Sequence, residues 1–384
     1  MLRKLVLTII IICWGSLISQ AQKSKVIAAF QLIETGKYAE AKKAIEEAIE
    51  DDKTWRWPKA WYARGLLCQT AYRQGIKDND KKKYELYPDQ LYVAFDSYQN
   101  ALKLDKRGRL NEQVAPMYVL LANDLQKLGE KHFQNKKYED ALKAFEYALQ
   151  INQSSILSIH LDSNLIYNTA LAAYKSKDWD KAIKYLHVLN ENNYSSNVAH
   201  LLFTVYIEKS DTTSAEEILV KGIEQYEDNK DLVLLLVDLL FQKDDTARAI
   251  GILDSAFIKS PSKYIYPYTK GLVYQKMENY QKAIDAYKEA ITLAPDELNI
   301  FKQMGLCYYN IGVAIEENAR KIKNNKIFRE EKAKSNSAFK SALSIFEEAY
   351  EKNPDDQMVI TKLYQLYKFL GMNDKIKNIE EQIN

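Results

Sequence analysis

Small residues and prolines recur in this chain at one fixed interval. The step from Ala215 to Ala249 equals the step from Ala249 to Ala283, and the same step separates Pro261 from Pro295. A fixed period of roughly 20 to 50 residues is the signature of a repeat array in which each repeat is one supersecondary unit. Because such a unit cannot bury its apolar face alone, neighbouring repeats must stack on one another. The period therefore predicts a stacked repeat fold.

The segment 264–297 is the clearest repeat and indicates the structure of one unit. Two antiparallel helices approach closely only where a small side chain on one helix faces a large side chain on the other. Pro295 is expected to end the second helix, because proline lacks the amide hydrogen and clashes with the preceding turn. The segment thus predicts a helix-turn-helix. Its small, aromatic and proline positions are Gly271, Tyr274, Tyr280, Ala283, Tyr287, Ala290 and Pro295.

This pattern closely resembles the consensus of the tetratricopeptide repeat (TPR). The resemblance covers essentially all of the chain after residue 21, strongly in the middle and weakly at both ends. It implies an all-α, right-handed superhelical solenoid of about nine helix-turn-helix repeats. We assign the repeats to residues 22–55, 58–107, 122–155, 163–195, 196–229, 230–263, 264–297, 298–356 and 357–384.

Two repeats, the second and the eighth, carry helical insertions. Between Cys68 and Leu91 we expect a lengthened first helix followed by an exposed, charged loop. Between Tyr309 and Ala342 there are about 25 extra residues without proline, and we expect both helices to continue as a projecting hairpin. A partly frayed hairpin is the alternative. We also expect residues 318–334 to form a second contact or an oligomer interface.

Residues 1–21 have the organisation of a secretory signal peptide. Arg3 and Lys4 form a positive segment, residues 5–14 are apolar, and Ser19-Gln20-Ala21 offers a small-x-small cleavage site. The apolar run is shorter than the ~20 residues that a spanning helix needs. We therefore expect cleavage after Ala21, no transmembrane span in the mature chain, and a periplasmic or envelope-associated bacterial protein. An uncleaved membrane anchor is the alternative.

The composition points away from several function classes. The 54 basic and 52 acidic side chains nearly cancel, so no global field favours nucleic acid as a partner. Only Cys68 and Cys307 remain after processing, and we expect both to be buried and unpaired.

Motifs that would carry catalysis are also missing from the sequence. His132, His160, His187 and His200 lie on separate segments without metal-ligand spacing, and no phosphate-binding loop or Gly-x-Ser-x-Gly motif occurs. Acidic pairs such as Asp244-Asp245 fall in turns, where Asp favours helix starts. We predict no cofactor, no metal and no catalytic residue.

The TPR resemblance implies that the first helices of the repeats line a concave groove for an extended or helical peptide. TPR adaptors that clamp a carboxylate tail use lysine and asparagine in successive repeats, whereas here Leu306 follows Lys302 at an asparagine position, so acidic tails are poor candidates. The candidate groove residues are Tyr62, Leu66, Phe133, Tyr167, Asn168, Leu171, Tyr174, Phe241, Tyr268, Leu272, Lys302 and Tyr309.

This lining favours amphipathic peptides, because aromatic side chains carry much of the binding energy at such surfaces. The prediction is a non-enzymatic, exported scaffold that binds a protein or peptide partner, in cell-envelope assembly or transport. A glycan or peptidoglycan binder that uses the same aromatics is the second hypothesis. An enzyme on a helical-repeat scaffold is the third.

Overall fold

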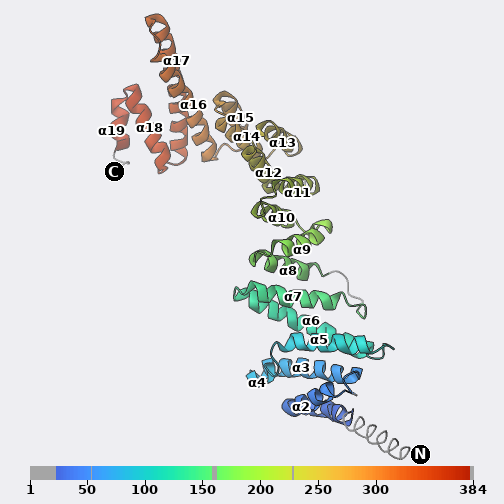
Figure 1. The fold of residues 1–384 in the computed structure, drawn as a ribbon. Helices are drawn as coiled ribbons and strands as arrows, with labels where there is room; N and C mark the ends of the chain where they lie inside the picture. Colours follow the sequence, from blue (N-terminus) through green and yellow to red (C-terminus); the bar gives the residue numbers. More distant parts are fainter. Residues whose placement is uncertain (1–22, 53, 158–161, 227–228, 381–384) are drawn as a thin grey trace, which may run out of the picture. The chain divides into compact units, whose positions relative to one another are not determined.

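The computed structural model of the protein describes residues 23–52, 54–157, 162–226 and 229–380, and all regular structure in these residues is helical (Figure 1). The predicted signal segment and His160 lie outside them. The chain divides into two compact units, Met1–Lys209 and Ser210–Asn384. The prediction of an all-α repeat solenoid is confirmed.

The first unit is a stack of antiparallel helices that pack mainly on their neighbours in sequence. A helix over residues 23–34 contacts α2 through Lys25, which donates to the Glu47 carboxylate (2.6 Å). Further along, α3 pairs with α5, α6 with α7 and α8 with α9, while α10 packs on α9. The helices are α2 (Tyr38–Glu50), α3 (Pro58–Asp78), α4 (Lys81–Tyr84), α5 (Gln90–Leu104), α6 (Asn111–Gln134), α7 (Tyr138–Asn152), α8 (Ser163–Lys175), α9 (Trp179–Glu191) and α10 (Ser196–Glu208).

The second unit continues the same pattern of hairpins. In it, α12 pairs with α13, α14 with α15, α16 with α17 and α18 with α19, and α11 packs on α12. The helices are α11 (Thr212–Gln225), α12 (Lys230–Gln242), α13 (Thr246–Lys259), α14 (Ile265–Lys276), α15 (Tyr280–Leu293), α16 (Leu298–Ala319), α17 (Asn325–Lys352), α18 (Gln357–Leu370) and α19 (Asn373–Glu380).

A close contact between a glycine and a buried aromatic ring holds four of the hairpins together. A Cβ atom added to any of these glycines would lie 2.4 to 2.9 Å from the ring of its partner. The small residue is thus required for the two helices to approach, as the repeat pattern predicted, and the ring fills the space between them. The pairs are Gly65–Tyr98, Gly129–Phe145, Gly271–Tyr287 and Gly305–Phe346.

Most hairpin turns contain one residue in the left-handed region, two positions before the second helix. Glycine takes this place at Gly36 and Gly371, with φ of 74° and 71°. Lys136, Lys177, Asp244 and Glu278 adopt the same conformation, with φ between 58° and 62°. The turn geometry therefore repeats along the chain although its sequence does not.

Side chains in the turns within and between hairpins also cap the starts of helices. The carboxylate of Asp245 accepts a hydrogen bond from the Arg248 amide (3.3 Å) at the start of α13. Asp356 accepts from the amides of Met358 and Val359 (both 3.1 Å) at the start of α18. These contacts satisfy amides that have no partner within the helix. The interpretation of the acidic pairs as caps is confirmed at these two positions.

Both insertions are helical. In the second repeat α3 continues to Asp78, and the short α4 then packs on it. In the eighth repeat α16 has 22 residues and α17 has 28, against 12 to 14 for α11 to α15 and for α18. The two long helices pack against each other, with the Phe339 ring on Gly312. Figure 1 shows the end of α17 reaching past the neighbouring helices of the second unit.

Candidate functional site

The candidate site is a groove in the second unit that lies across the first helices of three successive hairpins. It has a volume of about 510 Å³. We call it the α12–α16 groove. It is lined by Leu234, Val237, Asp238 and Phe241 of α12, Thr269, Leu272, Val273, Gln275 and Lys276 of α14, Tyr280 of α15, and Gln303 and Asn310 of α16.

The groove combines apolar surface with ordered amide groups. Gln275 accepts a hydrogen bond from the buried Tyr287 hydroxyl (2.6 Å) and donates one to the Gln303 side-chain oxygen (3.1 Å). Because Tyr287 is fully buried, these contacts hold the Gln275 amide in one orientation. Gln303 still has an amide NH₂ group to donate, which is the group that a peptide carbonyl needs.

Two groups of opposite charge lie in the same groove. The Lys276 ammonium lies 4.3 Å from the centroid of the Phe241 ring, a cation–π contact. Asp238 accepts a hydrogen bond from Gln242, one turn further along α12 (2.9 Å). The charges of Lys276 and Asp238 offset each other, so the groove does not select for a strongly acidic or basic ligand.

The structure brings two of the predicted site residues, Phe241 and Leu272, into this groove. Three others line a separate cavity of about 140 Å³ in the first unit, where Phe133 of α6 faces Asn168 and Leu171 of α8. This smaller cavity also lies between the first helices of successive hairpins. Its volume holds at most one or two side chains, so it can act only as a local pocket.

Four predicted tyrosines are half-buried and pack their rings on other aromatic residues. Tyr268 lies on Tyr287, with the ring centroids 5.9 Å apart. Burial of such rings leaves only part of each face for a ligand. The remaining neighbours are Phe30 and Tyr98 for Tyr62, Tyr194 for Tyr167, and Trp179 for Tyr174. Leu66 lies half-buried on α3.

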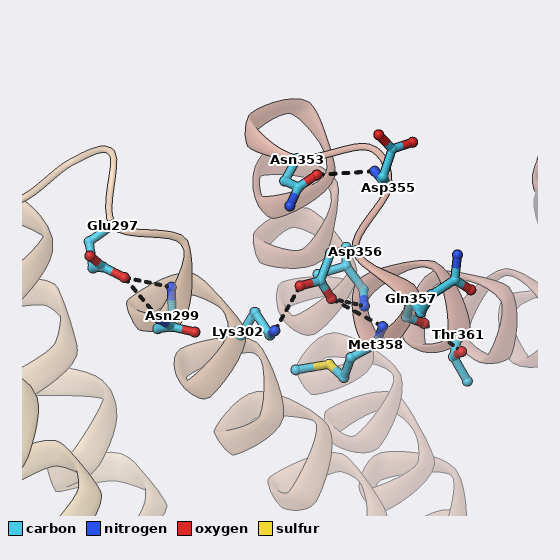
Figure 2. A network of polar contacts seen from close by, with 10 residues as sticks. Glu297, Asn299, Lys302, Asn353, Asp355, Asp356, Gln357, Met358 and Thr361 are labelled. Atoms are coloured by element: carbon cyan, nitrogen blue, oxygen red, sulfur yellow. Dashed lines mark hydrogen bonds and ion pairs between the residues drawn. The ribbon is translucent and has the colours of Figure 1, made fainter.

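Lys302 and Tyr309 lie where α16 meets the helices that follow it. The Lys302 ammonium donates to the Asp356 carboxylate (2.8 Å), which also caps α18 (Figure 2). Burial opposes ionisation of Asp356, but Lys302 and the amides of Val359 and Met358 outweigh it and lower the pKa of the carboxyl. The Tyr309 ring contacts Phe339 of α17 at 5.5 Å between centroids. Lys302 thus links α16 to the start of α18, and Tyr309 packs between the two helices of the eighth repeat.

The TPR resemblance did not identify every residue that lines the groove. The groove positions that the TPR resemblance implies also fall on Leu234, Asp238, Lys276 and Asn310, but not on Val237, Thr269, Val273, Gln275, Tyr280 and Gln303. Gln275 and Gln303 are oriented by hydrogen bonds to residues 12 and 28 positions away in the chain. The only sequence signal for them is their place on first helices, one turn from small or apolar core positions.

The other groups in the described part of the chain that could carry chemistry are metal-ligating side chains and thiols. No cluster of three or more His, Cys, Asp or Glu there could hold a metal ion. Cys68 and Cys307 are buried and unpaired, as expected, and burial raises the pKa of both thiols to about 12. Among the helices described, none is long and apolar enough to cross a membrane.

Comparison with known proteins finds relatives of low sequence identity. The chain is 21% identical over 239 residues to the BBSome complex member BBS4 of Bos taurus, an alignment that covers 62% of this chain and 45% of that protein. It is 21% identical over 266 residues to the peroxisomal targeting signal receptor of Komagataella phaffii, covering 69% of this chain and 40% of the receptor. The chain thus spans less than half the length of these relatives.

A solved structure of a TPR protein from Bacteroides fragilis is 20% identical, with a TM-score of 0.37, and covers 65% of this chain and 98% of that one. Family models described as tetratricopeptide repeat match residues 31–87, 165–194 and 268–297. The last match falls on the helix pair that contains the Gly271–Tyr287 contact. The chain is a tetratricopeptide-repeat protein.

Proposed function

We propose that the chain is a non-enzymatic adaptor that takes a peptide segment of a protein partner into the α12–α16 groove. The observation that carries the proposal is a continuous lining from three successive first helices, with apolar side chains beside ordered amides. TPR proteins bind protein or peptide partners, and the Komagataella relative is by its name a receptor for a targeting signal. The described lining of the groove contains no Ser, Cys or His side chain.

The lining defines the chemistry of the ligand. Leu234, Phe241 and Leu272 offer apolar and aromatic contact to one or two apolar side chains of the peptide. The Gln303 amide is placed to donate to a backbone carbonyl of an extended chain. A peptide with spaced apolar residues and little net charge fits this combination best.

Export to the bacterial cell envelope is also part of the proposal, and it rests on residues 1–21 alone. Arg3, Lys4, the apolar run and Ala21 have the order of a signal peptide. N-terminal sequencing of the protein recovered from a fractionated host tests this point. A mature chain that begins at Gln22 in the envelope fraction supports it, and a cytosolic chain that retains Met1 contradicts it.

A peptide library displayed on phage and selected against the purified mature chain tests the groove. Selected peptides should share spaced apolar residues and should bind Leu234→Ser/Phe241→Ser at least about 10-fold more weakly, since anchor residues contribute on the order of 2 kcal/mol or more. Ile258→Ser is the matched control, because Ile258 is an apolar side chain on α13 that is 79% exposed and is not part of the groove.

The outcomes separate the hypotheses. Equal binding of the selected peptides to wild type and to Leu234→Ser/Phe241→Ser removes the groove assignment. Absence of any shared sequence among the selected peptides contradicts peptide binding itself. The glycan hypothesis gains no support here, because most of the candidate aromatics pack on other rings.

A further inference from the structure

The tip of the α16–α17 hairpin concentrates positive charge. Five of the ten residues 320–329 are Lys or Arg, and no Asp or Glu occurs between residues 318 and 329. We call residues 320–329 the hairpin tip. The whole chain has a net charge of only +2, so this charge is a local feature. The cations of the hairpin tip are Arg320, Lys321, Lys323, Lys326 and Arg329.

Apolar side chains are exposed among these cations. Ile327 is 46% exposed and Phe328 is 37% exposed, and both lie in the first turn of α17. Phe328 lies on the same face of α17 as Ser335 and Phe339, which are buried against α16 lower down, yet Phe328 itself is partly exposed beyond the packed part of the hairpin. Exposed Ile and Phe side chains ringed by Lys and Arg are the composition of elements that bind the surface of a bilayer.

Contacts between α16 and α17 hold the two helices of the hairpin together below the tip. The Ser335 hydroxyl donates to the backbone oxygen of Gly312 (2.9 Å), and this contact is buried between the helices. Closer to the tip, the Lys332 ammonium forms an ion pair with Glu316 (2.5 Å). These contacts brace the two helices to within about a turn of the tip, so the tip forms the end of a braced hairpin.

The tip is also separated from the α12–α16 groove. Asn310, the groove residue nearest to it on α16, lies ten residues before Arg320, and ten helical residues span about 15 Å. None of the residues that line the groove lies further along the hairpin than Asn310. A surface bound at the tip would therefore leave the groove open.

We propose that the hairpin tip is a docking element for a membrane surface that contains anionic phospholipids. Lys and Arg bind the lipid phosphates, and Ile327 and Phe328 enter the boundary between head groups and acyl chains. Charge complementarity selects this occupant, because the five cations of the hairpin tip, of which Arg320 also pairs with Glu316 (3.6 Å), have no carboxylate between them and match an anionic surface. The assignment is independent of the proposed peptide binding and of the compartment in which the chain works.

Sedimentation with lipid vesicles tests the proposal. The full mature chain is mixed with vesicles of one part phosphatidylglycerol to two parts phosphatidylcholine, or of phosphatidylcholine alone, at about 0.1 M salt. Wild type should sediment with the anionic vesicles only. Lys323→Gln/Lys326→Gln should weaken binding about 25-fold, since each cation near such a surface contributes about 5-fold. Ile327→Ser/Phe328→Ser should also weaken binding.

A matched control exists in the first unit. Lys106→Gln/Arg107→Gln removes the same charge from another exposed basic turn, between α5 and α6. This variant should bind the anionic vesicles as wild type does. Circular dichroism of every variant should match wild type, because all the changed side chains are exposed.

Four results would overturn the proposal. The first is binding of Lys323→Gln/Lys326→Gln equal to that of wild type, and the second is equal binding to both vesicle types. The third is no binding to vesicles together with tip-dependent binding to poly-glutamate, which would assign the tip to an acidic protein. Tip-dependent dimerisation in sedimentation velocity without vesicle binding would likewise assign it to a second copy of the chain.

Discussion

The contact between Gly271 and Tyr287 gives a prediction in which two chemically identical changes have opposite effects. In a helix interior, Gly→Ala stabilises by roughly 0.5 to 1 kcal/mol, because alanine loses less backbone freedom on folding. Gly251 in α13 has no atom within 4 Å of an added Cβ. Gly251→Ala should therefore stabilise the second unit by about this amount.

Gly271→Ala adds the same methyl group where there is no room for it. The new Cβ would lie 2.4, 2.6 and 2.8 Å from three atoms of the Tyr287 ring, whereas carbon atoms pack at about 3.5 to 4.0 Å. The ring is fully buried, and its hydroxyl is hydrogen-bonded to Gln275 (2.6 Å). Overpacking of this kind costs about 1 to 3 kcal/mol, which exceeds the helix gain.

We expect Gly271→Ala to be less stable than Gly251→Ala by about 1 to 3 kcal/mol in urea unfolding monitored by circular dichroism. Hydrogen exchange should show faster opening of α14 and α15, because each repeat contacts only its neighbours. In a Tyr287→Leu background the penalty of Gly271→Ala should largely vanish. A Gly271→Ala variant as stable as Gly251→Ala would refute the packing argument.

Three further predictions concern buried polar groups and thiols. Tyr98→Phe removes the hydrogen bond to the Gln69 side-chain oxygen (2.9 Å) and should destabilise the first unit by about 1 to 2 kcal/mol in urea unfolding. Cys68 and Cys307 should react with a thiol reagent at about pH 8 only as fast as their repeats open, since burial holds the pKa of both thiols near 12; rapid labelling of the folded chain would contradict this. Because the folded-state pKa of Asp356 is lowered, its contribution to stability is present above about pH 4 and is lost as the pH falls through that lowered pKa. Asp356→Asn should therefore lose less stability on acidification than wild type, and parallel acid unfolding curves would disprove the assignment.

The sequence allowed the fold to be predicted because its period records packing that is local to one hairpin. Gly271 and Tyr287 belong to the two helices of a single repeat, and the approach of these helices is fixed by the repeat itself. The same reasoning placed Phe241 and Leu272 on first helices, where they line the groove.

The rest of the candidate site depends on contacts between repeats, which the period does not encode. Lys302 occupies a groove position in the repeat, yet its partner is Asp356, 54 residues further along the chain. Gln303 gains its orientation from Gln275 of the preceding repeat. Such pairs are specified by individual residues that differ from repeat to repeat, so a consensus cannot predict them.

The left-handed turn residues make this protein a scaffold that could be stabilised in separate, small steps. A residue with a Cβ atom destabilises the folded chain by about 1 to 2 kcal/mol in this conformation. Replacing it with glycine removes this strain but adds an entropic penalty of about 0.5 to 1 kcal/mol, so the net gain in stability is the difference. Lys136, Lys177, Asp244 and Glu278 lie in different turns, far enough apart for their effects to add. Replacing these residues with glycine one at a time should therefore raise the melting temperature in steps, without changing any residue that lines the α12–α16 groove.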